Sequence, residues 1–155
     1  MPLTLNFGVI DIPYSQAPKS RRRKSGSTPN VTTGDVAGFI EDKYALMETF
    51  YELHADDVIV PALEDAIDGA FEDLLAGAPL GASIFGTAEG KIDEAFRKSL
   101  DAKEYDGVIP GVETQAAARG VNHRLKRPYM KRASRPSFID TGLYQADFRS
   151  WVDET

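Results

Sequence analysis

Carboxylates are the most abundant side-chain groups in this 155-residue chain that could take part in catalysis or metal binding. Eleven of them fall between residues 41 and 73, where clustered carboxylates invite a metal site or a glycosidase-type acid–base pair. A carboxylate-bridged metal site needs a Glu-x-x-His motif, and Glu52 and His54 have the wrong spacing for one. A general acid needs burial, yet most of these acids fall opposite the apolar helix stripe. We interpret the stretch as a solvated acidic face, with docking of a basic partner as the functional alternative.

Groups for nucleophilic, thiolate or phosphate chemistry are scarce. The chain has no cysteine, which excludes disulfides, thiolate metal sites, cysteine nucleophiles and iron–sulfur clusters. Its two histidines, His54 and His123, have no serine or acid partner at a recognisable catalytic spacing, so surface or packing roles are expected. The stretch 77–90 lacks the Gly-Lys-Ser/Thr that grips a nucleotide phosphate. The sequence therefore predicts a protein that is not an enzyme and has no metal and no cofactor.

Charge is distributed in blocks along the chain. Residues 1–30 carry five bases and one acid, residues 31–106 eighteen acids and five bases, and residues 107–155 eight bases and five acids. The formal charge of −6 thus conceals an acidic middle between two basic segments. Such a molecule can dock to copies of itself, basic surface against acidic surface, as well as to a foreign partner.

Candidate residues for contact with a partner or with nucleic acid come from both basic segments. They are Arg21, Arg22, Arg23 and Lys24 in the first segment, and Arg124, Lys126, Arg127, Lys131 and Arg132 in the second. A flexible cationic stretch neutralises phosphates without sequence choice, although a solvated linker is an equal interpretation of the first segment. The second segment also holds Tyr129, and aromatic residues among bases suit single strands. No helix-turn-helix or zinc-finger pattern favours specific DNA recognition.

The N-terminus has the pattern of a strand followed by a linker. Leu3, Leu5, Phe7 and Val9 alternate with small or polar residues, which predicts a strand over residues 3–9. Residues 15–34 are rich in serine, proline, glycine and base, as linkers are. A lone strand is unstable in water, so it must pair with a distant part of its own chain or with another chain. We assign these four apolar residues to an inter-subunit arm, and divide the chain into an arm with a basic linker (1–34) and a helical domain (35–155).

Apolar residues at three- and four-residue spacing predict helices through the rest of the chain. The expected helices cover 35–54 with Thr33 as cap, 61–76 with Pro61 in the first turn, a segment from Thr87 to Leu100, and 114–126 opened by Thr114 and ended by Pro128. The apolar stripe of the second includes Ile67, Phe71, Leu74 and Leu75. Asp140 can cap a short terminal helix, and a strand through 148–152 is the alternative. The predicted fold class is mainly α, with four to five helices and a minor β element from the extended N-terminal arm.

The N-terminal residues contain no basic region followed by a long apolar run, so no secretory signal is expected. No stretch approaches the roughly 18 apolar residues that span a bilayer. We expect the protein to work in a soluble, reducing compartment or to be indifferent to redox.

The last third of the chain resembles the C-terminal region of small virion proteins of tailed bacteriophages, namely neck, tail-completion or virion-morphogenesis proteins. The likeness is carried by Arg-Gly-Val-Asn-His-Arg at 119–124 and by residues 136–144, which end in the turn Asp140, Thr141, Gly142, Leu143 and Tyr144. In that group an Asp-Thr-Gly-Leu turn precedes a polar–apolar stretch ending in a packed aromatic, here Gln145 to Trp151. Residues 5–15 and 32–54 also look like one such lineage.

The resemblance implies a structural virion protein of the head-to-tail neck, a connector, tail-completion or tail-terminator ring through which DNA passes. It implies as partners copies of the chain in a ring (a hexamer or dodecamer), neighbouring head or tail proteins, and DNA contacted non-specifically, with no membrane. The expected location is the virion, assembled in the host cytoplasm. The residues alone give the Asp140–Gly142 turn a capping role. The alternative function is a small nucleic-acid-associated or regulatory protein that uses the two basic segments.

Overall fold

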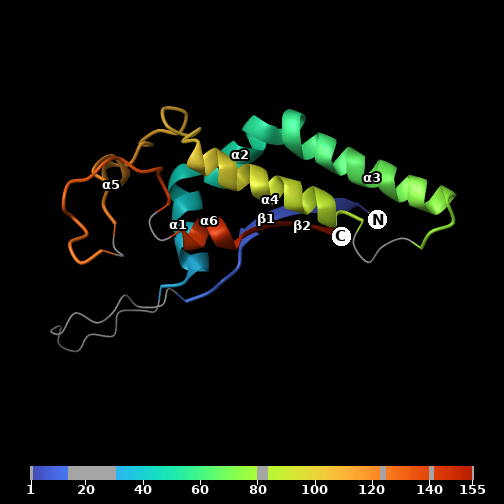
Figure 1. Cartoon of the computed structure of the whole chain (residues 1–155), viewed down its shortest axis with the longest axis horizontal. Coiled ribbons are helices and arrows are strands. Elements are labelled where there is room, and N and C mark those ends of the chain that lie inside the picture. The colour runs from blue at the N-terminus through green and yellow to red at the C-terminus, as the bar shows by residue number, and fades with distance from the viewer. Residues whose placement is uncertain (1, 14–30, 80–83, 123–124, 140–141, 155) are drawn as a thin grey trace.

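The computed structural model describes residues 2–13, 31–79, 84–122, 125–139 and 142–154. The elements in chain order are β1 (Leu3–Val9), α1 (Thr33–Tyr44), α2 (Leu46–His54), a π-helical turn η1 (Ala55–Ile59), α3 (Val60–Leu75), α4 (Gly86–Asp101), α5 (Gln115–Ala118), α6 (Leu143–Asp147) and β2 (Phe148–Glu154). The fold is mainly α with one small antiparallel sheet, as predicted (Figure 1). Within the described ranges, no helix has the length and apolarity to cross a membrane.

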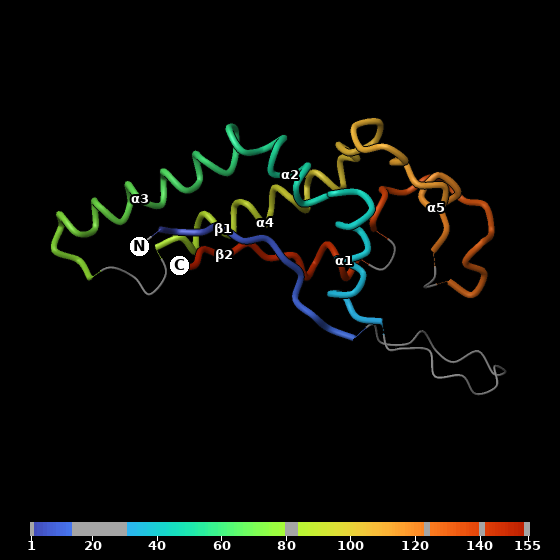
Figure 2. Tube along the Cα trace, turned by 180° about the vertical axis from the view of Figure 1, so that it is seen from behind, coloured from blue at the N-terminus to red at the C-terminus, as the bar shows by residue number. Residues whose placement is uncertain are grey.

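The two ends of the chain form the sheet. β1 pairs antiparallel with β2, with Leu3 opposite Glu154 and Val9 opposite Phe148, so the terminal strands run side by side (Figure 2). The strand therefore finds its partner in its own chain, the first of the two alternatives that the sequence left open. An additional role of Leu3, Leu5, Phe7 and Val9 in contacts between subunits stays a prediction.

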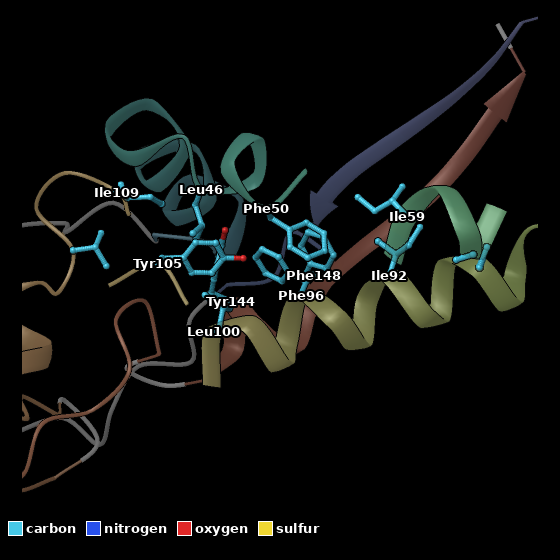
Figure 3. Packing of buried hydrophobic residues seen from close by; sticks show 13 residues of the cluster. Leu46, Phe50, Ile59, Ile92, Phe96, Leu100, Tyr105, Ile109, Tyr144 and Phe148 are labelled. Carbon is cyan, nitrogen blue, oxygen red and sulfur yellow. The ribbon is translucent and has the colours of Figure 1, made fainter. Parts of the chain in front are cut away.

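An aromatic cluster joins the sheet to the helices (Figure 3). Phe96 of α4 stacks on Phe148 of β2 with ring centroids 3.8 Å apart, and Phe50 of α2 meets Phe96 edge-on at 5.1 Å. All three side chains are fully buried, and Phe7 of β1 packs against Phe50 at 6.0 Å. Aromatic pairs in these geometries stabilise beyond the area they bury. β1 is thus part of the same core as the helices.

The single helix predicted over 35–54 is two helices. Ala45 adopts a left-handed conformation (φ 46°, ψ 49°) that ends α1 before α2 begins. The Glu41 carboxylate then accepts hydrogen bonds from the backbone N–H groups of Met47 (2.8 Å) and Glu48 (3.2 Å). These are first-turn donors of α2 that no helical carbonyl reaches, so Glu41 caps the second helix and stabilises the break.

The N-terminus of α1 also differs in detail from the prediction. Its cap is Thr32, in a reciprocal capping box with Asp35, and not Thr33. Thr33 is buried instead and its hydroxyl donates to the Ile10 carbonyl, which ties α1 to the segment after β1. Hydrogen bonds from the Thr32 side chain and the Gly34 N–H lower the pKa of Asp11 at the same junction.

Helices α3 and α4 form an antiparallel hairpin that extends away from α1 (Figure 1). Pro61 lies in the first turn of α3, as predicted, directly after the wide turn η1. On α4 the regularly spaced apolar side chains of Ile92, Phe96 and Leu100 are buried. Helix α4 therefore packs against the core, and α3 lies on the outer side of α4.

The helix predicted over 114–126 is wrong beyond its first turn. Thr114 caps it as expected, with its hydroxyl accepting from the Ala117 N–H at 3.2 Å, but α5 ends at Ala118. Gly120 then takes φ +64°, and a Cβ there would lie 2.3 Å from the Ala133 carbonyl oxygen. Glycine is the residue that fits such a turn, so the chain folds back instead of continuing the helix.

The C-terminal segment contains both alternatives in succession. α6 covers Leu143–Asp147 and β2 follows from Phe148 without a break. The predicted capping residue Asp140 lies outside the described residues; Gly142, with φ +79°, precedes the helix. The strand alternative for residues 148–152 is therefore confirmed, since the short helix ends before them.

Candidate functional site

In the described part of the chain, no three His, Cys, Asp or Glu side chains are grouped so that they could hold a metal ion. His54 does have a partner that sequence spacing hid. Its Nε2 lies 2.9 Å from a carboxylate oxygen of Glu104, and its Nδ1 lies 3.6 Å from Asp57. The ring also packs against Phe50, with centroids 5.1 Å apart. These contacts fasten the end of α2 to the loop after α4, as the expected packing role requires.

The predicted motif turn serves to seat one helix. Asp140 and Thr141 lie outside the described residues, while Leu143 opens α6 and Tyr144 is buried against Phe96, with ring centroids 6.2 Å apart. The next residue, Gln145, donates its side-chain amide to the Arg97 carbonyl at 2.8 Å. These contacts of Tyr144 and Gln145 hold α6 against α4. Strand β2 follows α6 directly and pairs with β1.

The described parts of the second basic segment, residues 119–122 and 125–135, form a loop region that we call the basic lobe. Arg132 donates to the backbone carbonyls of Arg127 (2.9 Å) and Met130 (3.3 Å). Arg135 donates in the same way to Val121 (2.7 Å) and Ile139 (2.8 Å). Arg132, predicted as a contact residue, is therefore occupied in holding its own loop, where its guanidinium satisfies carbonyls that no helix or sheet satisfies.

The remaining bases of the basic lobe point outward. Lys126, Arg127 and Lys131 are exposed, and none of the ion pairs among the described residues includes them. Met130 and Tyr129 are exposed beside them, to 58% and 76%. Three of the predicted contact bases thus lie exposed in one loop, next in sequence to two exposed side chains that are aromatic or apolar. Arg124 and the run Arg21–Lys24 lie outside the described residues.

The far end of the α3–α4 hairpin carries a surface of opposite charge, which we call the acidic hairpin end. The predicted apolar stripe of α3 is not buried there: Phe71, Leu74 and Leu75 are exposed to 60%, 57% and 87%. Phe71 and Leu74 line a groove of about 370 Å³ that also includes Leu3 and Ile84. A second groove of about 370 Å³ shares Ala70 and Ile84 with the first and is lined by acids of α3, including Asp65, Glu72 and Asp73.

The acids of this surface are largely unneutralised. Helix α3 has five acids and no base. Lys91 of α4 pairs with Asp65 at 2.8 Å, but the ion pairs among the described residues include none with Asp68, Glu72 or Asp73. The acidic hairpin end and the basic lobe lie at opposite ends of the molecule in both views (Figures 1 and 2).

One edge of the sheet is closed by carboxylates of α4. Asp93, which is buried, accepts hydrogen bonds from the Ser150 N–H at 2.7 Å and from the Ser150 hydroxyl at 2.9 Å. Glu89 accepts from the Val152 N–H at 3.1 Å. The outward N–H groups of Ser150 and Val152 thus have side-chain partners on α4, which closes this part of the edge to a further strand.

The edge of β1 is open. The Ile10 N–H donates to the Asp147 carbonyl at 2.9 Å, which fixes the phase of the antiparallel ladder. The backbone groups of Leu3, Leu5, Phe7 and Val9 therefore point away from β2, and no hydrogen bond to them is found from another described element. A groove of about 690 Å³ runs beside residues 3–7 and is closed on its far side by residues of α1 and α2, including Glu41, Met47 and Tyr51.

Together these observations define a small, mainly α protein with a two-stranded sheet and several exposed apolar or charged surfaces. No protein-family description, no curated protein and no solved structure matches the chain.

Proposed function

We propose that this chain is a structural protein of a tailed-phage virion, a subunit of the neck ring between head and tail through which DNA passes. The observation that carries the proposal is the open edge of β1. A seven-residue strand without a charged side chain and with an unpaired row of backbone groups is a liability for a monomer. It is a ready acceptor for a strand of a neighbouring subunit, because main-chain hydrogen bonds then extend the sheet.

The resemblance of residues 119–124 and 136–144 to neck and tail-completion proteins supports the same function. The described parts of these segments, residues 119–122, 136–139 and 142–144, belong to the basic lobe, to the stretch that follows it and to the start of α6. The predominance of acids over bases also suits a ring that DNA passes without sticking, since like charges repel.

The proposal is tested in a phage that encodes this chain. An amber mutation in its gene is expected to produce DNA-filled heads and separate tails, because the two halves cannot join without the neck. Purified wild-type protein added to such an extract is expected to restore infectious particles. Infectious virions that lack the protein, as determined by mass spectrometry of purified particles, overturn the proposal.

A second candidate function is non-specific nucleic-acid binding, which the three outward bases of the basic lobe beside Tyr129 favour. Fluorescence anisotropy with a single-stranded oligonucleotide is expected to show binding that weakens steeply with salt, since each phosphate contact releases counterions. Alanine at Lys126, Arg127 and Lys131, or at Arg21, Arg22 and Arg23, is expected to reduce the salt dependence. Absence of binding at low salt eliminates this candidate.

A further inference from the structure

The molecule presents two exposed surfaces that complement each other and cannot meet within one chain. The basic lobe displays Lys126, Arg127 and Lys131 around exposed apolar side chains. The acidic hairpin end displays Asp68, Glu72 and Asp73 beside exposed phenylalanine and leucine. Since the two surfaces lie at opposite ends of the elongated molecule, a copy can satisfy either one only by contact with a second copy (Figures 1 and 2).

We infer that the basic lobe of one copy docks on the acidic hairpin end of the next copy, with Phe71, Leu74 and Leu75 as the apolar centre of the contact. The docking contact itself does not depend on the proposed function. Only the closure of the repeated contact into a ring rests on it. The occupant is a second copy because both halves of the match, apolar centre and opposite charge, are already present on this chain.

The apolar part of this contact follows from the exposure of α3. Phe71 and Leu74 are more than half exposed, and Leu75 almost wholly so. Buried aromatic and aliphatic anchors in a groove are the parts of an interface that carry most of its binding energy. Met130 and Tyr129 of the basic lobe supply apolar surface to cover them, and the groove at the hairpin end is open enough to receive a side chain.

The charged part of the contact sets its direction. A basic lobe facing another basic lobe, or two acidic hairpin ends facing each other, would place like charges together, which costs several kcal/mol and suppresses the wrong pairing. Only lobe to hairpin end matches. This contact joins two different surfaces, so it repeats from copy to copy and forms a ring when its rotation closes.

The basic lobe is also pre-organised to bind. Arg132 and Arg135 hold its backbone by hydrogen bonds of 2.7 to 3.5 Å to loop carbonyls, and the tight turn at Gly120 fixes its entry. A loop that is ordered before binding loses less entropy when it docks. The outward bases therefore lie on a surface with a defined shape.

Charge reversal on each surface tests the contact. The lobe variant carries Lys126→Glu, Arg127→Glu and Lys131→Glu, and the hairpin variant carries Asp68→Lys, Glu72→Lys and Asp73→Lys. Sedimentation velocity over a concentration series is expected to show self-association of the wild type, which salt weakens, and roughly tenfold to hundredfold weaker association of each variant. An equimolar mixture of the two variants is expected to associate again, as is a chain that carries both sets of changes.

Two controls separate this contact from general effects of charge and folding. Asp42→Lys on α1 and Lys98→Glu on α4 change exposed charges outside both surfaces and are expected to leave association unchanged. Phe71→Ser is expected to weaken association about tenfold or more without lowering the melting temperature, because the ring is 60% exposed in the monomer.

The outcomes also separate this inference from the proposed function. A wild type that stays monomeric at every concentration, or association that neither reversal changes, overturns the docking contact. Rings in electron micrographs that persist in both variants overturn it too, while leaving a neck function intact. An antiparallel dimer that depends on the same charges keeps the contact and overturns its closure into a ring. Association restored by the mixed variants, in a protein absent from virions, supports the contact and refutes the neck function.

Discussion

Replacing Asp93 should open the closed edge of the sheet. In Asp93→Ala the Ser150 hydroxyl keeps its hydrogen bond to the Glu89 carbonyl at 3.1 Å, but the buried Ser150 N–H loses its acceptor at 2.7 Å. A buried donor left unsatisfied costs about 1 to 3 kcal/mol, and a lost hydrogen bond to a charged group lies at the upper end of that range. We therefore expect a loss of about 3 kcal/mol in the free energy of unfolding.

Two milder changes calibrate this value. Asp93→Asn keeps one carbonyl oxygen for Ser150 and is expected to cost about 1 kcal/mol, as is Ser150→Ala, which removes the hydroxyl and leaves the N–H with its partner. Asp101→Ala removes an exposed acid of the same helix and is expected to change stability by less than about 0.5 kcal/mol.

The assay is urea unfolding followed by two probes. Trp151, the only tryptophan, lies in β2 next to Ser150, so its fluorescence reports the sheet, while circular dichroism reports the helices. Coincident transitions for the two probes justify a two-state treatment. An Asp93→Ala protein within about 0.5 kcal/mol of wild type would refute the reasoning that this carboxylate closes the edge.

Other perturbations test the core, the basic lobe and the break between α1 and α2. Burial, together with the nearby Glu104 charge, raises the pKa of Tyr105 to about 12 against the opposing effect of its hydrogen bond with Ser99, so the folded state favours the neutral phenol. The stability that the neutral Tyr105 phenol contributes is fully present below pH 10. About 2 to 3 kcal/mol of it is lost as the pH rises from 10 toward 12, because the unfolded chain ionises there first. Thermal melts should show this loss in wild type and not in Tyr105→Phe. Gly120→Ala should cost more than about 2 kcal/mol and expose the basic lobe to proteolysis, whereas Gly77→Ala, at φ +74° with nothing within 4 Å of its Cβ position, should cost only about 1 kcal/mol. Glu41→Ala should cost about 1 kcal/mol by uncapping α2, with loss of helical circular dichroism, and an unchanged signal and stability would contradict the capping role.

Local periodicity located most of the helices but not what covers them. The stripes on α3 and α4 look equally apolar in the sequence, yet Ile92 and Phe96 are fully buried while Phe71 and Leu75 are mostly exposed. A repeat of 3.6 residues identifies the apolar face of a helix and carries no information on the element that packs against it. The exposure of the apolar stripe at the acidic hairpin end therefore could not be predicted from the sequence pattern.

The features that sequence reasoning missed depend on contacts between distant residues or on single backbone angles. Alanine favours helix, so the residue type at position 45 does not predict a left-handed conformation there. The capping of α2 by Glu41 depends on where its side chain lies in the folded structure. The pairing of residues 3–9 with residues 148–154 spans almost the whole chain, and an alternating pattern cannot name its partner. The close approach of Ala133 to Gly120, which ends α5, is equally non-local.

The open edge of β1 and the two charged ends belong to different kinds of contact, and this difference bears on how a ring could be built. Two copies paired through their β1 edges would use the same surface twice, and such a two-fold contact ends at a dimer. Lobe-to-hairpin docking uses two different surfaces and can continue around a ring. If copies occupy the charged ends, the β1 edge stays available on every subunit, facing the groove beside α1 and α2. If the proposed neck function holds, we expect the strand that extends the sheet at this edge to come from the next protein along the head-to-tail axis, once per subunit.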